Sequence, residues 1–235
     1  MRLSEQERAS NRAAFRSMGL AQKAEYIFAY YKLPLVLALI AAVALGTVVS
    51  RALTHKDARL YVAFANVVPP AEVETALTTG YLQQSGADPA RTEVLCYHEL
   101  YLSRDANTPD HQYAYASRLK VMAAAEGQQL DAALMNQEAY DLLSAEGYLR
   151  DLTDTFADSN ALRSNRVVLA SNRVEVDLNE TETLQEQSVE QANALEVTDS
   201  PLLQGFSGDE PLYLGVITNS PRTDEALAYL AYVCR

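Results

Sequence analysis

Residues 33–49, LPLVLALIAAVALGTVV, contain no charged side chain, and their polar content is one Thr and one Gly. An α-helix needs about 20 mostly apolar residues to cross a hydrocarbon core about 30 Å thick. The stretch approaches that length when the flanking residues up to Ser50 are counted, and Pro34 falls in the first turn, where its missing N–H costs little. The sequence therefore predicts a single transmembrane helix over residues 33–50, with the lipid bilayer as its partner.

Two other structures compete for this apolar run. A cleaved signal peptide has a short basic region before an apolar core of about 7–15 residues, whereas 32 residues precede this run. The small-residue cleavage candidate near residues 44–46 also falls inside the run. A buried core helix of a soluble domain normally has a polar face, and this run has none. Both alternatives are weaker than an uncleaved anchor.

The charge distribution predicts the orientation of the anchor. Residues 1–32 have a net charge of +3, which leaves −15 for the remaining chain against an overall −12. Lys and Arg residues close to a membrane span favour the cytoplasmic side. We therefore expect a cytoplasmic juxtamembrane helix over residues 1–32, the span over 33–50, a connector over 51–58 and an extracytoplasmic domain over 59–235. This places the protein in the plasma membrane, with its C-terminal domain outside.

The outer part is long enough to form one domain with a proper core. Its acidic balance argues against a nucleic-acid partner, because affinity for phosphates comes from Lys and Arg. The residues from 59 onward alternate between apolar, β-branched runs and helical patterns. Strands are predicted at 60–67, 92–97 and 130–135, and helices at 70–84, 108–125 and 136–147. This order predicts an α/β domain with a mainly parallel sheet flanked by helices.

The pattern is less regular after residue 147. Residues 166–171 and 173–177 suggest a hairpin that turns at Ser171 and Asn172. Residues 175–199 contain eight acids and no Lys or Arg, which favours a solvated loop or an exposed helix. A strand at 212–218 follows, and then a closing helix that Thr223 is expected to cap.

Candidate ligand-binding residues follow from this topology. In parallel sheets, ligands bind beyond the carboxyl ends of the strands. Asn66, Glu99 and Asn136 come at those ends, and Asn219 follows the late strand. We predict that these four residues bind a small molecule or peptide. The alternative is that they serve as ordinary loop-capping residues.

Sequence signals for catalysis are scarce. His98-Glu99 begins like an HExxH zinc-protease motif, but the second His position holds Leu102. The chain has no phosphate-binding glycine loop and no nucleophile elbow. The three histidines have no spacing typical of a metal site, so no metal, no cofactor and no enzymatic activity are predicted.

The two cysteines, Cys96 and Cys234, lie beyond the anchor. An oxidising compartment permits a disulfide between them. The alternative is that each is a small buried hydrophobic residue. Both structures stay open at this point.

Two segments resemble bacterial extracellular solute-binding proteins. One is LDAALMNQEAYDLLSAEGYLRDLT at residues 130–153, where Asp131 lies in an apolar strand before a short helix and a GxLxxL-like turn. The other is LGVITNSPRTDEALAYLAYV at residues 214–233, with Ser220, Glu225 and Ala226 at the matching places. The resemblance implies one lobe of that fold, or a reduced version of it.

Two functions follow from these observations. The first is a membrane-anchored, non-enzymatic binding domain outside the cytoplasm, resembling a solute-binding lobe. The second is a structural or accessory subunit of a membrane protein complex, suggested by the N-terminal helix and the acidic stretch.

Overall fold

The computed structural model describes residues 19, 34, 36–47, 50, 55–105, 109–156, 168–177, 186–206 and 210–235. The chain forms two compact units, Met1–His55 and Lys56–Arg235. In the first unit, residues 36–47 are helical and exposed. Within the described ranges, no helix is both long and apolar enough to cross a membrane. Most of the predicted juxtamembrane helix, the ends of the predicted span and the start of the connector lie outside the described residues.

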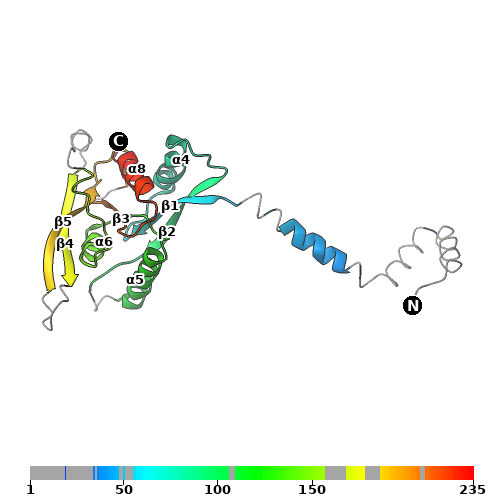
Figure 1. Ribbon diagram of the computed structural model, residues 1–235, viewed down its shortest axis with the longest axis horizontal. Coiled ribbons are helices and arrows are strands. Elements are labelled where there is room, and N and C mark those ends of the chain that lie inside the picture. Colours follow the sequence, from blue (N-terminus) through cyan, green and yellow to red (C-terminus); the bar gives the residue numbers. More distant parts are fainter. Residues whose placement is uncertain are drawn as a thin grey trace. The chain divides into compact units, whose positions relative to one another are not determined.

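The second unit contains one six-stranded sheet with the strand order β2-β1-β3-β6-β5-β4 (Figure 1). In sheet order, the strands are β2 (Thr92–Leu100), β1 (Asp57–Ala65), β3 (Ala132–Met135), β6 (Tyr213–Val216), β5 (Glu186–Glu196) and β4 (Val168–Asp177). β1 pairs in parallel with both β2 and β3. This half of the domain matches the predicted strands and confirms the α/β class.

The other half of the sheet is antiparallel, so the prediction of a mainly parallel sheet was wrong. β6 runs antiparallel to β3 and to β5, and β5 runs antiparallel to β4. The segment between β4 and β5 is too short to hold a crossover helix, and antiparallel strands need only a short connection. The result is a mixed sheet whose two halves meet at β3 and β6.

Helices cover both faces of this sheet (Figure 1). One face carries a continuous helical stretch, made of α3 (Ala71–Thr75), a π-helical turn (Ala76–Gly80) and α4 (Tyr81–Gln84), together with α8 (Thr223–Val233). The other face carries α5 (His111–Glu126) and α6 (Gln137–Ala145). A short 3-10 helix, Pro201–Leu203, precedes β6.

Alternation along the central strands explains how both faces become buried. On β1, Leu60, Val62 and Phe64 belong to the core beneath α8, whereas Ala63 and Ala65 belong to the core beneath α5 and α6. Successive side chains of a strand point to opposite faces of the sheet. A strand covered on both faces therefore needs a continuous apolar run, which is the pattern that made these strands recognisable.

Of the residues predicted to cap helices, one does so in the structure and one does not. Asn136 caps α6 as predicted, because its Oδ1 accepts a hydrogen bond from the Ala139 N–H at 3.1 Å. The prediction for Thr223 was wrong: it is the first residue of α8, the N-cap position is Arg222, and the Thr223 hydroxyl donates to the Ser220 carbonyl at 2.9 Å.

The predicted hairpin at Ser171 and Asn172 was also wrong, and so was the loop or helix at residues 175–177 and 186–196, which belong to β4 and β5; residues 178–185 lie outside the described residues. β4 runs without a turn from Val168 to Asp177 and pairs along its whole length with β5. Between Ala170 and Ser171 the pairing register shifts, so that β5 holds an extra residue, Asn193. This bulge directs a polar side chain into the core, where Asn193 accepts from Tyr140 at 2.9 Å and donates to Ser144 at 2.8 Å.

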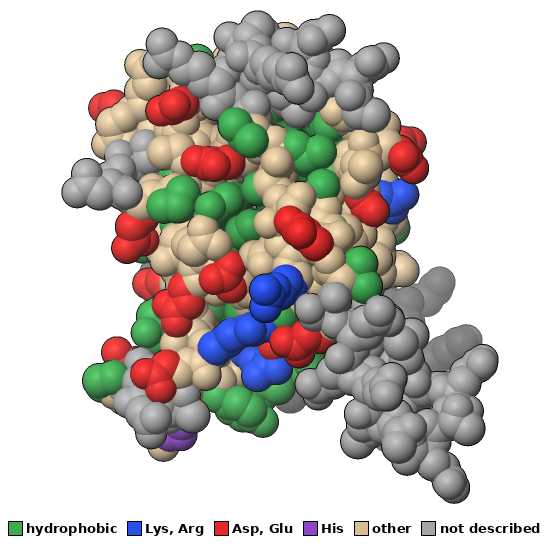
Figure 2. Space-filling view, turned by 90° about the vertical axis from the view of Figure 1, so that its left-hand side faces the viewer, with side chains coloured by type: hydrophobic (Ala, Val, Ile, Leu, Met, Phe, Trp, Pro, Cys, Tyr) green, Lys and Arg blue, Asp and Glu red, His purple; other side chains and the backbone are tan. Residues whose placement is uncertain are grey.

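Acidic side chains are scattered over the face of the domain that carries β4 and β5, whereas Lys and Arg side chains are fewer, some together in a small group and others apart from it (Figure 2). Hydrophobic side chains also reach this surface, and Val168 and Val189 are each about half exposed. This distribution agrees with the net charge of −12. It is the opposite of the basic surface that phosphate backbones require.

Candidate functional site

Three of the four predicted ligand residues lie at the carboxyl edge of the parallel strands, and the contacts they make there are to the protein's own backbone and side chains. Asn66, at φ +58°, exchanges two hydrogen bonds with the backbone of Leu102, at 2.6 and 2.7 Å. The side chain of Asn136 caps α6 and contacts Glu210 at 3.4 Å. Glu99 is exposed, has φ +55°, and its carbonyl accepts a hydrogen bond from the hydroxyl of Tyr113.

The structure does not bring Asn219 to the other three residues. It follows β6, which runs antiparallel to β3, so it lies at the opposite edge of the sheet. Its amide donates to the Ala125 carbonyl at 2.9 Å, near the end of α5. The four residues therefore do not form one site, because the reversed direction of β6 separates them.

Both cysteines are thiols in the structure, which does not contain the disulfide that the sequence left open as one of two alternatives. Cys96 is on β2, and Cys234 ends α8 in a buried position. Burial raises the pKa of each thiol to about 12, and the charge of Glu74 adds to this effect at Cys96. The alternative of a small buried residue describes Cys234, whereas Cys96 is only partly buried.

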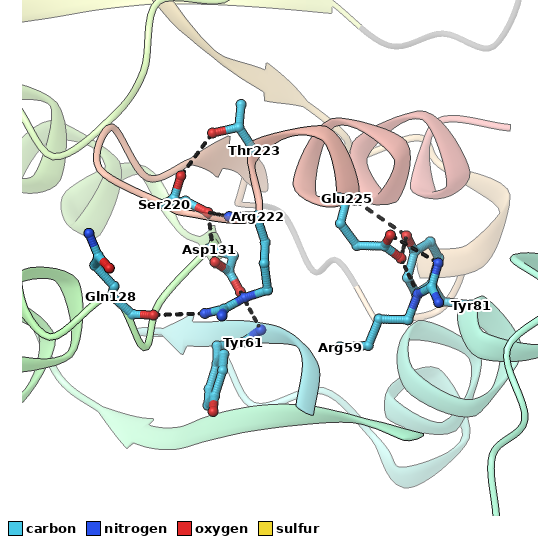
Figure 3. Close-up of polar contacts among 9 residues, drawn as sticks. All are labelled: Arg59, Tyr61, Tyr81, Gln128, Asp131, Ser220, Arg222, Thr223 and Glu225. Atoms are coloured by element: carbon cyan, nitrogen blue, oxygen red, sulfur yellow. Dashed lines mark hydrogen bonds and ion pairs between the residues drawn. The ribbon is translucent and has the colours of Figure 1, made fainter. Parts of the chain in front are cut away.

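A polar cluster at the opposite edge of the parallel strands centres on Asp131 (Figure 3). Asp131 is fully buried just before β3. One carboxylate oxygen accepts from the Tyr61 N–H at 2.8 Å and from the Arg222 Nε at 2.8 Å. The other accepts from the Ser220 hydroxyl at 2.6 Å. Charge-assisted hydrogen bonds of this kind compensate the cost of burying a carboxylate.

Arg222 is fixed by three different contacts. Besides its bond to Asp131, it donates to the Gln128 carbonyl at 2.7 Å. Its guanidinium carbon also lies 4.7 Å from the centre of the Tyr61 ring, in cation–π geometry. The turn before α8 is therefore tied to β1, to β3 and to the loop after α5.

A second ion pair lies on the other side of the first turn of α8. Arg59 on β1 forms a bidentate ion pair with Glu225. The Arg59 Nε donates to Glu225 Oε1 at 2.5 Å, and Nη2 donates to Oε2 at 3.0 Å. The Tyr81 hydroxyl donates to the same carboxylate at 2.6 Å. Partial burial of Glu225 opposes ionisation, but the bonds from Arg59 and Tyr81 outweigh it and hold the pKa of this carboxyl below its ordinary value.

Between these two pairs lies an open hollow of about 450 Å³. Its lining combines two arginines with the first turn of α8: Arg59, Pro221, Arg222, Thr223, Asp224 and Glu225. The first N–H groups of a helix have no acceptor within the helix and carry partial positive charge. Asp224 is exposed. The hollow therefore offers hydrogen-bond donors and a carboxylate side by side, within the size range of ligand pockets.

The polar groups of the Asp131 cluster are hydrogen-bonded to one another. Asp131 has accepted three hydrogen bonds, and the Ser220 hydroxyl is engaged with Asp131 while its oxygen accepts from the Arg222 N–H at 3.1 Å. A nucleophile needs an adjacent base that can take its proton. Here the Asp131 carboxylate is paired with Arg222, so the cluster holds the Ser220 hydroxyl in position rather than activating it as a nucleophile.

Within the described ranges, one group of side chains has metal-ligand chemistry at close range. Glu74, Cys96 and His98 each offer a ligand atom, and the three atoms lie within 4.8 Å of one another. The sequence did not predict this group, because only the pair on β2 is close in sequence and Glu74 comes from α3.

The sequence alone did not indicate Arg59 or Arg222, the two arginines of the hollow, either. The sequence signal for this site is Asp131, a carboxylate within the apolar run 130–135. A buried carboxylate needs hydrogen-bond donors, so its presence there implies a cationic or polar partner. Its partner Arg222 is 91 residues away.

Comparisons of the chain with family models, with curated proteins and with solved structures found no match.

Proposed function

We propose that this protein is a membrane-anchored, non-enzymatic binding protein whose α/β domain lies outside the cytoplasm. Its ligand would be a zwitterionic small molecule or the end of a peptide, bound in the hollow between Arg59 and Arg222. The observation that carries this proposal is the mixed charge of the hollow: two guanidinium groups and the first turn of α8 stand beside the carboxylate of Asp224.

The charges in the hollow argue for a ligand with both signs. Arg59 and Arg222 are already paired with Glu225 and Asp131, so their positive charge is largely compensated. A simple anion would also meet the charge of Asp224. An amino acid or peptide terminus can place its carboxylate at the N–H groups of α8 and its ammonium group at Asp224.

The two segments that resemble solute-binding proteins support this proposal because they meet at Asp131, next to Arg222, which lines the hollow. Asp131 belongs to the first segment and Ser220 to the second, and they are hydrogen-bonded at 2.6 Å. The described residues of the outer domain build one sheet, which corresponds to a single lobe. We therefore propose binding at an open surface of one lobe, without a second lobe closing over the ligand.

A thermal-shift screen of the full chain in detergent micelles tests the ligand. The probes are the standard amino acids, short dipeptides, simple carboxylates and simple amines. At 100 times its Kd, a ligand stabilises a protein by about 2.7 kcal/mol, or about 5–10 °C for a chain of this size. We expect amino acids or dipeptides to raise the melting temperature and the single-charge compounds to fail. A screen in which no zwitterion has an effect would contradict the proposal.

The membrane anchor is tested separately. The proposal rests on the uncharged run 33–49 and on the surplus of Lys and Arg before it. In intact spheroplasts, external protease should remove a C-terminal epitope and spare an N-terminal one. The reverse pattern would overturn the orientation, and recovery of the intact chain in the soluble fraction would overturn the anchor.

An accessory role in a membrane complex is the second proposal. It is favoured by the β4–β5 ribbon at the edge of the sheet, where Val168 and Val189 are each about half exposed. An edge strand offers unpaired backbone groups to a partner. Crosslinking in native membranes followed by pull-down should recover a defined partner in constant proportion. Recovery of this chain alone would count against the role.

A further inference from the structure

Glu74, Cys96 and His98 form a compact group of three different metal-ligand types. The His98 Nε2 lies 3.5 Å from the Glu74 Oε1, and all three ligand atoms lie within 4.8 Å of one another. Glu74 and Cys96 are partly buried, and His98 is exposed. The group is therefore open to an ion from solvent and is also backed by the core.

The backbone explains why these side chains converge. Cys96 and His98 are two residues apart on β2, so their side chains point to the same face of the sheet. Glu74 belongs to α3, which begins the helical stretch covering this face. The His98 ring also packs against Phe64, with centroids 5.3 Å apart, which restricts its orientation.

The spacing fits a four-coordinate ion after a small adjustment. With Zn–S near 2.3 Å and Zn–N and Zn–O near 2.0–2.2 Å, a tetrahedral site has ligand atoms about 3.3–3.6 Å apart. The His98–Glu74 distance of 3.5 Å already meets this requirement. The remaining distances are within 4.8 Å, and the side chains of His98 and Glu74, which are 46% and 37% exposed, have room to rotate and shorten them.

We propose that Glu74, Cys96 and His98 bind a divalent transition-metal ion of the Zn²⁺ class and leave one coordination position open to water or a ligand. Thiolate and imidazole together select borderline-soft ions such as Zn²⁺ and Co²⁺ over Mg²⁺ and Ca²⁺, which prefer oxygen ligands alone. The site is independent of the proposed ligand at the hollow, since it shares none of its lining residues.

A divalent ion at this group would bind Cys96 as the thiolate, because a coordinating thiol is deprotonated outright. Metal binding should therefore release the Cys96 proton to solvent, with the thiolate becoming the ligand.

Titration of the full chain with Co²⁺, in micelles and with a non-coordinating reductant, tests the proposal. We expect one equivalent to bind with a thiolate-to-cobalt charge-transfer band and with the strong visible absorption of a tetrahedral site. About one proton should appear per ion in a weakly buffered indicator assay. Excess Zn²⁺ should displace the cobalt, and Mg²⁺ should not.

Matched variants identify the ligands. Cys96→Ser should abolish the charge-transfer band. Loss of a residue that only hydrogen-bonds to a metal ligand costs about 10–100-fold in affinity. His98→Gln removes a ligand itself and should therefore weaken binding by more than this. Glu74→Gln, at a partly exposed helix position that should fold normally, should weaken binding as well. Cys234→Ser and His111→Gln are controls that should bind like the original chain. The proposal is overturned if no charge-transfer band forms, if the band survives Cys96→Ser, or if the controls lose it.

Discussion

The two arginine–carboxylate pairs beside the first turn of α8 differ in how far the carboxylate is removed from water. Asp131 is 0% exposed, whereas the side chain of Glu225 is 23% exposed. Asp131 receives donors from β1, from the turn before α8 and from Arg222. Glu225 receives donors from Arg59 and Tyr81 and retains contact with solvent.

This difference predicts unequal energetic roles for two pairs with similar geometry. Breaking a buried pair leaves an uncompensated charge and costs about 3–5 kcal/mol, whereas an exposed pair contributes about 0–1 kcal/mol. Asp131 is therefore the residue that holds the hollow in shape. Glu225 mainly positions Arg59 at its rim.

Asp131→Asn should have the largest effect of the changes considered, a loss of about 3–5 kcal/mol in the free energy of unfolding. The amide keeps the shape of the side chain but removes the charge that Arg222 needs. Urea unfolding followed by circular dichroism measures the loss. Asp224→Asn, an exposed change in the same turn of α8, should cost at most about 1 kcal/mol. Equal costs for the two variants would contradict the role of Asp131.

Ser220→Ala should have an intermediate effect, about 1–3 kcal/mol, because it removes one donor to Asp131 and the acceptor of the Arg222 N–H. The matched control is Ser85→Ala, whose hydroxyl donates to the Leu82 carbonyl at an exposed helix end. The control should change stability by no more than about 0.5 kcal/mol. If both variants are neutral, the Asp131 cluster does not depend on Ser220.

Glu225→Gln should cost less, about 0.5–1 kcal/mol, because the pair with Arg59 is partly exposed. The same unfolding measurement applies, and Asp224→Asn again corrects for the loss of an acid near the helix start. If Glu225→Gln lowered the free energy of unfolding as much as Asp131→Asn, the Arg59–Glu225 and Arg222–Asp131 pairs would not differ in their contribution to stability, against the account.

The smallest expected effect is a change with pH. The pKa of Glu225 in the folded protein lies below its ordinary value of 4.5, so the carboxylate contributes stability above that value. This contribution is lost as the pH falls from about 4.5 through the folded-state pKa. The difference in melting temperature between the original chain and Glu225→Gln should therefore shrink between pH 6 and pH 3, values chosen to bracket that range. A difference that stays constant or grows would contradict this sign.

The parallel half of the sheet could be predicted from sequence, and the antiparallel half could not, for a physical reason. β1 and β3 are buried on both faces, and their apolar runs are distinct. The β4–β5 ribbon is exposed at positions such as Arg173, Glu175 and Glu190, so its strands carry charged residues and amides in place of a hydrophobic alternation. Asn193 is buried by a bulge, and a bulge leaves no local pattern in this sequence.

The candidate site was partly visible in the sequence. Asp131, Ser220 and Glu225 were noticed because they carry a resemblance, but their partners were not. Arg59 and Glu225 are 166 residues apart, and local periodicity contains no information about such a pair. The four residues predicted from strand ends failed to converge because one of the strands, β6, runs in the reverse direction.

The central claim is that the hollow beside α8 binds a zwitterion through groups of both signs. Isothermal titration calorimetry of the full chain and of Asp224→Asn, with the best amino acid or dipeptide from the screen, tests it most directly. A charge-assisted hydrogen bond contributes about 1.5–3 kcal/mol, so Asp224→Asn should bind about 10–150-fold more weakly while its melting temperature without ligand stays nearly unchanged. Equal affinity of the two proteins, or no heat of binding for the original chain, would contradict the account.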